Sequence, residues 1–169
     1  MAKVALISSA GGHLTEVLAI AAELGGEHDL FLCVTDCPAV RHIRLDEVRR
    51  IYLAPVVWRH RHSRVFRRRQ QQIGVLVTMV RWLVTFLRLF YHERPDFLIT
   101  CGAEIAVPAF LVNRLLFRRP ALYLESLART ETPSLTGRIA SRLADRVFVQ
   151  WPAVRAYYGE RAEYHGRLL

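Results

Sequence analysis

Short apolar runs alternate along the chain with longer segments of helical periodicity. The first run is Lys3 to Ser9, and after Ala-Gly-Gly-His at 10–13 apolar residues recur at helical spacing as far as Leu24. Runs of the same short type follow at residues 29–35, 50–53, 96–100, 121–125 and 146–149. Short buried strands that alternate with helices predict an α/β fold, in which a parallel sheet is covered by helices on both faces.

One segment departs from this alternation. Residues 57–69 are dense in arginine and histidine, and residues 73–91 are almost wholly apolar. Together with Gly74, the few polar positions fall at steps of three and four residues, which places them in one narrow stripe of a helix. They are Gln71, Thr78, Arg81, Thr85, Arg88 and His92. An ordinary crossover helix needs only one apolar face, so this helix requires a second apolar neighbour.

We predict that this helix, residues 70–92, lies in a membrane interface. Nineteen apolar residues would reach about 28 Å, close to the thickness of a bilayer core, but two arginines at mid-depth would be costly there. In the interfacial arrangement, basic side chains meet anionic headgroups and aromatic side chains enter the leaflet. These membrane contacts are Arg67, Arg68 and Arg69, and Trp82, Phe86 and Phe90. A spanning helix, a buried core helix and a subunit interface are the alternatives.

Composition limits the class of protein and of partner. The 169 residues are 52% apolar, which suits one globular domain spanning 1–169. The 24 Lys+Arg outnumber the 15 Asp+Glu, and the net charge of +9 favours an anionic partner. Nucleic acid is disfavoured, because the basic block adjoins a long apolar helix and no nucleic-acid-binding motif is present. Neither an Asp-x-Asp motif nor a zinc-type cysteine spacing occurs, so no metal is expected.

The glycine turn after the first run is a candidate phosphate site. Gly11 and Gly12 allow a sharp turn and a close approach of the backbone, and the N–H groups of the following helix carry the positive end of its dipole. His13 is placed to take a proton from an attacking hydroxyl or to donate a hydrogen bond to phosphate. The alternatives are a tight connection that binds nothing and a histidine that only caps the helix.

Four stretches in this order resemble one family. They are Ser8–Glu16 (SSAGGHLTE), Thr100–Pro108 (TCGAEIAVP), Tyr123–Gly137 (YLESLARTETPSLTG) and Val149–Trp151 (VQW). The chain is similar, nearly end to end, to the membrane-anchoring subunits of two-part glycosyltransferases. These comprise a bacterial exopolysaccharide and capsule type and a eukaryotic counterpart in dolichol-linked oligosaccharide synthesis. A more distant similarity is to the amino-terminal half of the enzyme that adds N-acetylglucosamine to the peptidoglycan lipid precursor.

The resemblance implies half of a GT-B glycosyltransferase. In this superfamily two Rossmann-like halves face a cleft: the amino-terminal half takes a lipid-pyrophosphate acceptor and touches the membrane, and the other half holds a UDP-sugar. On this resemblance, a separate catalytic subunit brings the UDP-sugar. This chain itself binds a polyprenyl-pyrophosphate-linked acceptor and carries no cofactor. Sugar transfer inverts the anomeric carbon, and this chain alone is inactive. No leader precedes the first strand, so we expect the cytoplasmic face of a membrane.

The same resemblance implies the site residues. The catalytic candidates are His13 and Glu104, and the acceptor or pyrophosphate contacts are Ser9, Gly11, Gly12, His13, Gly102, Glu125 and Arg129. Three of these residues have alternative roles without a ligand. The helix dipole alone favours a carboxylate such as Glu104 at a helix start. Glu125 and Arg129 are four residues apart and can pair with each other. Residues 132–137 predict a loop followed by a helix cap.

Two other function classes compete with the glycosyltransferase subunit. The first is a dinucleotide-binding module, in which Asp36 would be the acid that follows the second strand, but the turn at 9–13 lacks two of the three fingerprint glycines. The second is a membrane adaptor that only recruits a partner. An adaptor would tolerate loss of His13 or Glu104, whereas a subunit that forms the catalytic cleft would not.

Overall fold

The computed structural model describes residues 1–41, 45–56 and 68–169 of the chain, with the backbone alone for 68–73. The basic segment predicted at 57–69 therefore lies almost wholly outside the described residues, as does the membrane contact predicted for Arg67. Arg68 and Arg69 begin a helix. Their predicted contact with headgroups stays a prediction.

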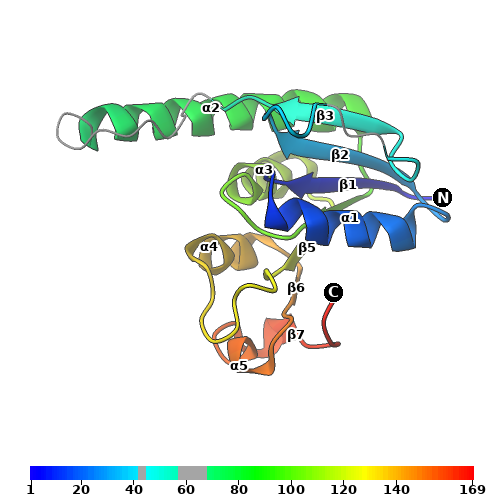
Figure 1. Cartoon of the computed structure of the whole chain (residues 1–169). Coiled ribbons are helices and arrows are strands. Elements are labelled where there is room, and N and C mark those ends of the chain that lie inside the picture. The colour runs from blue at the N-terminus through cyan, green and yellow to red at the C-terminus, as the bar shows by residue number, and fades with distance from the viewer. Residues whose placement is uncertain (42–44, 57–67) are drawn as a thin grey trace.

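A single parallel sheet of seven strands forms the centre of the protein, in the order β3-β2-β1-β4-β5-β6-β7 (Figure 1). The strands are β1 (Lys3–Ser8), β2 (Asp29–Thr35), β3 (Arg50–Ala54), β4 (Phe97–Thr100), β5 (Ala121–Leu124), β6 (Arg146–Phe148) and β7 (Ala162–Glu163). β1 is paired on one side with β2, from Lys3 opposite Asp29, and on the other with β4, from Val4 opposite Phe97. The predicted α/β fold with a parallel sheet is confirmed.

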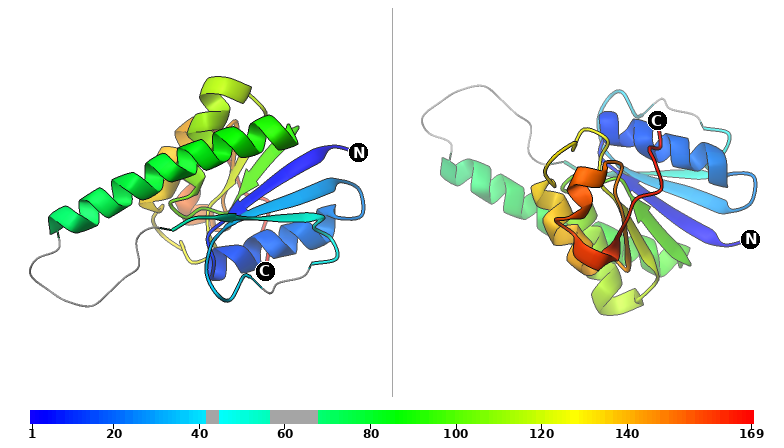
Figure 2. Two further views of the ribbon diagram at one scale, coloured as in Figure 1. Left: turned by 90° about the horizontal axis from the view of Figure 1, so that it is seen from above. Right: turned by 90° about the horizontal axis from the view of Figure 1, so that it is seen from below.

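Helices cover both faces of the sheet. They are α1 (Gly12–Leu24), α2 (Arg68–Glu93), α3 (Ala106–Val112) with the π-helical turn η1 (Asn113–Phe117), α4 (Leu135–Leu143), α5 (Pro152–Arg155) and the 3₁₀ turn η2 (Gly159–Arg161). Alternate strand residues divide between two cores: Ala5 and Ile7 pack with α2, α3 and α4, whereas Val4 and Leu6 pack with α1. This division is what a parallel sheet buried on both faces requires. Figure 2 shows α1 and α2 on opposite sides of the sheet.

The long apolar helix α2 packs against the sheet with the aromatic side chains that were predicted to contact a membrane. Trp82, Phe86 and Phe90 are all buried, and the indole N–H of Trp82 donates to the carbonyl of Pro55 at 2.8 Å. The prediction of membrane contact for these three residues is wrong. Because the helix is apolar on most of its circumference, sequence periodicity does not decide which arc meets the sheet.

A different arc of α2 is exposed and apolar. It carries Leu76, Val77, Val80, Val84, Leu87 and Tyr91, all more than 40% exposed. We call this exposed apolar arc the outer stripe of α2. Arg81, Arg88 and His92 lie along one of its edges. The segment Gly74–Glu93 is long and apolar enough to cross a membrane, and only 28% of it is buried inside the structure. The amino-terminal half of α2 extends beyond the sheet (Figures 1 and 2).

The carboxyl end of α2 is fixed by an internal ion pair. Glu93 is buried, with Lys3 Nζ at 3.3 Å and an Arg50 guanidinium nitrogen at 3.4 Å, and it also accepts a hydrogen bond from the Tyr52 hydroxyl. These contacts join the end of α2 to β1 and β3. The helix is thus held at its carboxyl end and along its inner arc.

Replacement of Phe86 by alanine tests the packing of α2. The side chain is fully buried, so its loss is expected to lower the free energy of unfolding by about 3–5 kcal/mol through lost burial and a cavity. Val84→Ala, on the outer stripe, is the matched control and should change stability by less than about 0.5 kcal/mol. Urea unfolding of the detergent-solubilised protein measures both. Equal losses would contradict the assignment of inner and outer arcs.

Candidate functional site

The candidate site lies at the carboxyl ends of β1 and β4. The strand order reverses between them, because the chain leaves β1 through α1 towards β2 on one side and leaves β4 through α3 towards β5 on the other. At such a switch point two neighbouring loops diverge to opposite faces and leave a crevice, which is where open α/β sheets bind ligands. The loops here are residues 9–11 and 101–105.

The glycine turn after β1 is open towards this crevice. Gly11 has φ +102° and precedes Gly12, the first residue of α1, and a methyl group added at either glycine would meet no atom within 4 Å. The turn is tied to β2, because Ala10 N donates to Thr35 Oγ1 at 2.9 Å. The first N–H groups of a helix have no partner inside it. There is thus open space beside both glycines, and the binding of an anion at Gly11 and Gly12 stays a prediction.

His13 packs over Gly102 from the neighbouring loop. A methyl group built on Gly102 would lie 3.4 Å from His13 Cε1 and 3.6 Å from Nδ1, and Gly102 has φ +101°, a conformation in which other residues are strained. The structure thus brings together two predicted site residues that are 89 positions apart. His13 Nδ1 is buried and has no hydrogen-bond partner among the residues that the structure describes. The side chain does not cap α1, whose cap residue is Gly11.

A cavity of about 760 Å³ adjoins the turn and runs to α2. Its polar end is formed by the strand-end residues Ser9, Ala10, Thr35, Asp36, Cys37 and Pro38 together with Glu104, and its apolar end by Val56, Val75, Thr78, Met79 and Trp82. Ser9 and Glu104 are thus placed at one opening. Glu104 is exposed and lies before α3, which begins at Ala106, so it is not in the first helical turn. Asp36 is balanced by a 2.7 Å ion pair with Arg41.

Glu125 is in the interior, contrary to prediction. Its carboxylate is 1% exposed and accepts hydrogen bonds from the hydroxyls of Tyr123, Ser134 and Tyr158 and from the backbone N–H groups of Ser126 and Ser134. Burial and these bonds to Glu125 raise the pKa of both tyrosines. The predicted contact between Glu125 and the acceptor is therefore wrong.

Arg129 lies away from this carboxylate. Its side chain is exposed, and it supplies none of the donors to Glu125, so the two residues do not pair.

The helix cap predicted within residues 132–137 is confirmed, since Ser134 Oγ accepts from Gly137 N at 2.8 Å at the start of α4. Glu125 thus secures this cap and the loop before it, which is a structural role.

Glu16 is a functional candidate that sequence analysis missed. Its side chain is 4% exposed, and Oε1 accepts hydrogen bonds of 2.9 Å from Ser126 Oγ and from Leu127 N, while Oε2 is buried without a partner. Burial raises its pKa, against the lowering effect of these hydrogen bonds and of His13. Its position one helical turn after His13 was the available signal. The partners, more than 100 residues away, were not visible in the sequence.

Neither cysteine of the sheet is suited to nucleophilic chemistry. Burial raises the pKa of the Cys33 thiol to about 12 and raises that of Cys101 well above its usual value. A thiol with a raised pKa holds little thiolate near neutral pH. Among the described residues, no three His, Cys, Asp or Glu side chains come close enough together to hold a metal ion.

The comparisons with known proteins identify the family. A family model described as "Oligosaccharide biosynthesis protein Alg14 like" matches residues 4–168. The chain belongs to the Alg14-like family. The human UDP-N-acetylglucosamine transferase subunit ALG14 is 27% identical over 177 residues, which cover 97% of this chain and 82% of that protein. This match agrees with the predicted resemblance to the eukaryotic anchor subunit, while the bacterial exopolysaccharide and capsule type stays a prediction.

Solved structures show the fold of this Alg14-like chain in larger enzymes. MurG of Acinetobacter baumannii matches with a TM-score of 0.69 and 20% identity over 97% of this chain, and the UDP-N-acetylglucosamine 2-epimerase of Rickettsia bellii with 0.71 and 11% over 99%. The chain spans about 45% of the length of each. The architecture is therefore that of one half of a GT-B protein. It does not distinguish transfer from epimerisation.

A pH titration of stability tests the environment of Glu16. Burial raises the pKa of the Glu16 carboxyl in the folded protein above its value in the unfolded chain. Between these two pKa values, the folded protein therefore binds one proton that the unfolded chain has lost. Stability from Glu16 is then complete below the unfolded pKa of about 4.5 and is lost as pH rises through the folded value, by about 1.4 kcal/mol for each unit of difference. Relative to Glu16→Gln, the wild type should lose stability as pH rises above about 4.5 in urea unfolding.

Glu23→Gln, at an exposed position of the same helix, is the control for this titration. It should follow the wild-type pH profile. Parallel profiles for wild type and Glu16→Gln would contradict a raised pKa at Glu16.

Proposed function

We propose that this Alg14-like chain is the acceptor-binding, membrane-associated subunit of an inverting UDP-N-acetylglucosamine transferase, and that a separate chain supplies the donor-binding half. The observation that carries the proposal is the cavity, whose lining runs from Ser9 and Ala10, directly before the open glycines, to an apolar wall formed by α2. A polyprenyl-pyrophosphate-linked sugar has these two parts, an anionic group and a long apolar tail.

In the proposed complex the diphosphate lies at Gly11 and Gly12. The N–H groups at the start of α1 donate to its oxygens, and the helix dipole favours the charge. The ion pair of Asp36 with Arg41 removes most of the repulsion that an acid at this end of the cavity would cause. The tail follows the apolar wall towards Val75 and Met79. Glu104, at the polar end, lies where the acceptor sugar would leave the cavity.

His13 is the proposed general base. Its Nδ1 has no partner in the described part of the chain, and its ring lies at the junction of the two site loops. It takes the proton of the acceptor hydroxyl as oxygen attacks the anomeric carbon of the donor, and the UDP leaves on the opposite side. The donor comes from the partner chain, so the chain alone forms only one wall of the cleft.

His13→Ala tests the catalytic role, assayed with the donor-binding subunit reconstituted in vesicles with UDP-N-acetylglucosamine and lipid-linked acceptor. Loss of a general base is expected to lower kcat by about 10²- to 10⁴-fold with little change in KM. His28→Ala is the matched control, because His28 also has a buried, unpartnered Nδ1 but lies before β2 at the opposite end of the sheet. A raised KM with unchanged kcat would make His13 a diphosphate ligand instead. Full activity in His13→Ala would favour a recruiting adaptor.

The outer stripe of α2 is the proposed membrane contact. Charge substitution there should weaken membrane binding without unfolding the protein, because the side chains are exposed. We expect Val80→Glu with Leu87→Glu to move most of the chain from the membrane pellet to the supernatant. The control is Leu115→Glu with Leu116→Glu, at residues that are 64% and 62% exposed on η1. If the two double variants sediment alike, the outer stripe is not the membrane contact.

A further inference from the structure

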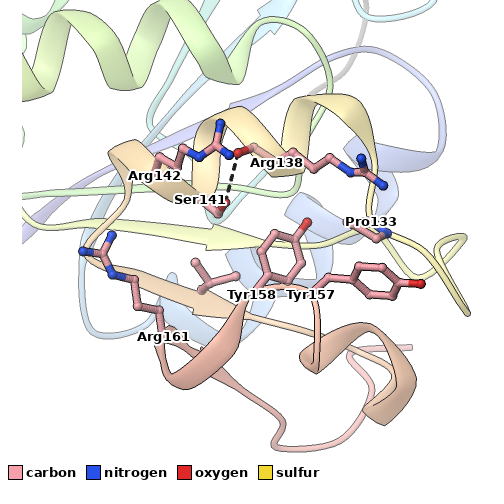
Figure 3. A pocket seen from close by; sticks show the side chains of 8 residues that line it. Pro133, Arg138, Ser141, Arg142, Tyr157, Tyr158 and Arg161 are labelled. Atoms are coloured by element: carbon pink, nitrogen blue, oxygen red, sulfur yellow. Dashed lines mark hydrogen bonds between the residues drawn. The ribbon is translucent and has the colours of Figure 1, made fainter.

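A second pocket lies between α4 and the segment that follows α5, over β6 (Figure 3). It measures about 420 Å³ and shares no lining residue with the cavity at the carboxyl ends of β1 and β2. Its lining side chains are Pro133, Arg138, Ser141, Arg142, Val147, Tyr157, Tyr158 and Arg161. Neither the family match nor the predicted site accounts for this pocket.

The lining of the pocket is rich in positive charge, and the carboxylate of Glu125 is buried behind Tyr158. Arg138 and Arg142 are one turn apart on α4, and Arg161 comes from η2 on the facing side. None of the three forms an ion pair within the described part of the chain, and no acidic side chain is among the lining residues. All three side chains are exposed, and their guanidinium groups point in different directions in Figure 3. An anion that enters the pocket would be attracted by each of them.

The aromatic wall of the pocket is held in place. The Tyr158 hydroxyl donates to the buried carboxylate of Glu125, so this ring is fixed from behind. Tyr157 is 56% exposed at the rim, and its hydroxyl is available as a donor. A fixed wall lowers the entropy that a ligand must remove when it binds. The pocket therefore has one fixed wall, formed by Tyr158, beside three exposed arginines.

We infer that this pocket binds a phosphate or diphosphate group. Guanidinium groups pair with phosphate oxygens through two parallel N–H bonds, and a ligand with two or more negative charges uses several arginines at once. The same chemistry is offered by a soluble phosphate compound and by the headgroup of an anionic lipid. The inference rests on Arg142, Arg161 and Arg138, and stands apart from the cleft around His13.

Two paired variants test the inference on the full chain in detergent. Arg142→Gln with Arg161→Gln removes two charges from the pocket, and Arg118→Gln with Arg119→Gln removes two from exposed positions after η1. Calorimetric titration with inorganic pyrophosphate is the first arm. We expect the pocket variant to lose one binding event, or to weaken it at least tenfold, relative to the control variant. The comparison holds whether or not the cleft also binds pyrophosphate.

Vesicle flotation is the second arm and identifies the source of the phosphate. Phosphatidylcholine vesicles are used with and without phosphatidylglycerol. Loss of the phosphatidylglycerol-dependent binding in the pocket variant alone assigns the site to a lipid headgroup, whereas a difference confined to pyrophosphate assigns it to a soluble phosphate. Thermal unfolding checks that both variants are folded. If the two variants behave alike in both arms, the inference is overturned.

Discussion

The reversal of strand order between β1 and β4 is the constraint on which the site depends. Because the chain leaves these two strands towards opposite faces, their loops separate at the edge of the sheet and leave room for a ligand. The same reversal brings His13 within contact of Gly102. A side chain at 102 would strain the backbone, and its Cβ would already be in contact with the imidazole, so the geometry of the crevice and the identity of this residue are linked.

Two buried carboxylates hold the loops around the crevice. Glu16 joins the start of α1 to the loop after β5, and Glu125 joins that loop to α4 and to the segment after α5. A buried carboxylate is costly unless it is well supplied with donors, and each of these receives backbone N–H as well as hydroxyl bonds. The loops are consequently fixed relative to one another before any ligand binds. Loops that are already fixed are suited to form one wall of a cleft with a second chain, because little conformational entropy is lost when they bind it.

The sequence predicts the sheet and the turns better than the roles of single acids. Each central strand is a continuous apolar run, as a sheet buried on both faces demands, and glycine marks both site loops. Glu125 follows a strand, a position at which ligand-binding acids are also found. Only its burial and its hydrogen bonds to distant residues show that it points into the interior and not towards a ligand. The spacing of Glu16 from His13 was the only signal in the sequence, because the hydrogen-bond partners of Glu16 are more than 100 residues away. On α2 the apolar pattern extends around most of the helix, so packing against the sheet, and not periodicity, selected Trp82 and Phe86.

The two arcs of α2 meet where the cavity opens. Trp82 and Met79 face the cavity from the inner arc, whereas Leu76 and Val80 lie on the outer stripe, and Val75 both lines the cavity and is 44% exposed. An apolar chain that reaches Val75 from a membrane at the outer stripe would therefore pass from one apolar surface to another without crossing water. Exposure of that chain to water would cost about 0.8 kcal/mol for each methylene. On the proposed function, this continuity explains why one helix carries both a core arc and an exposed apolar arc, and why its free end extends beyond the sheet.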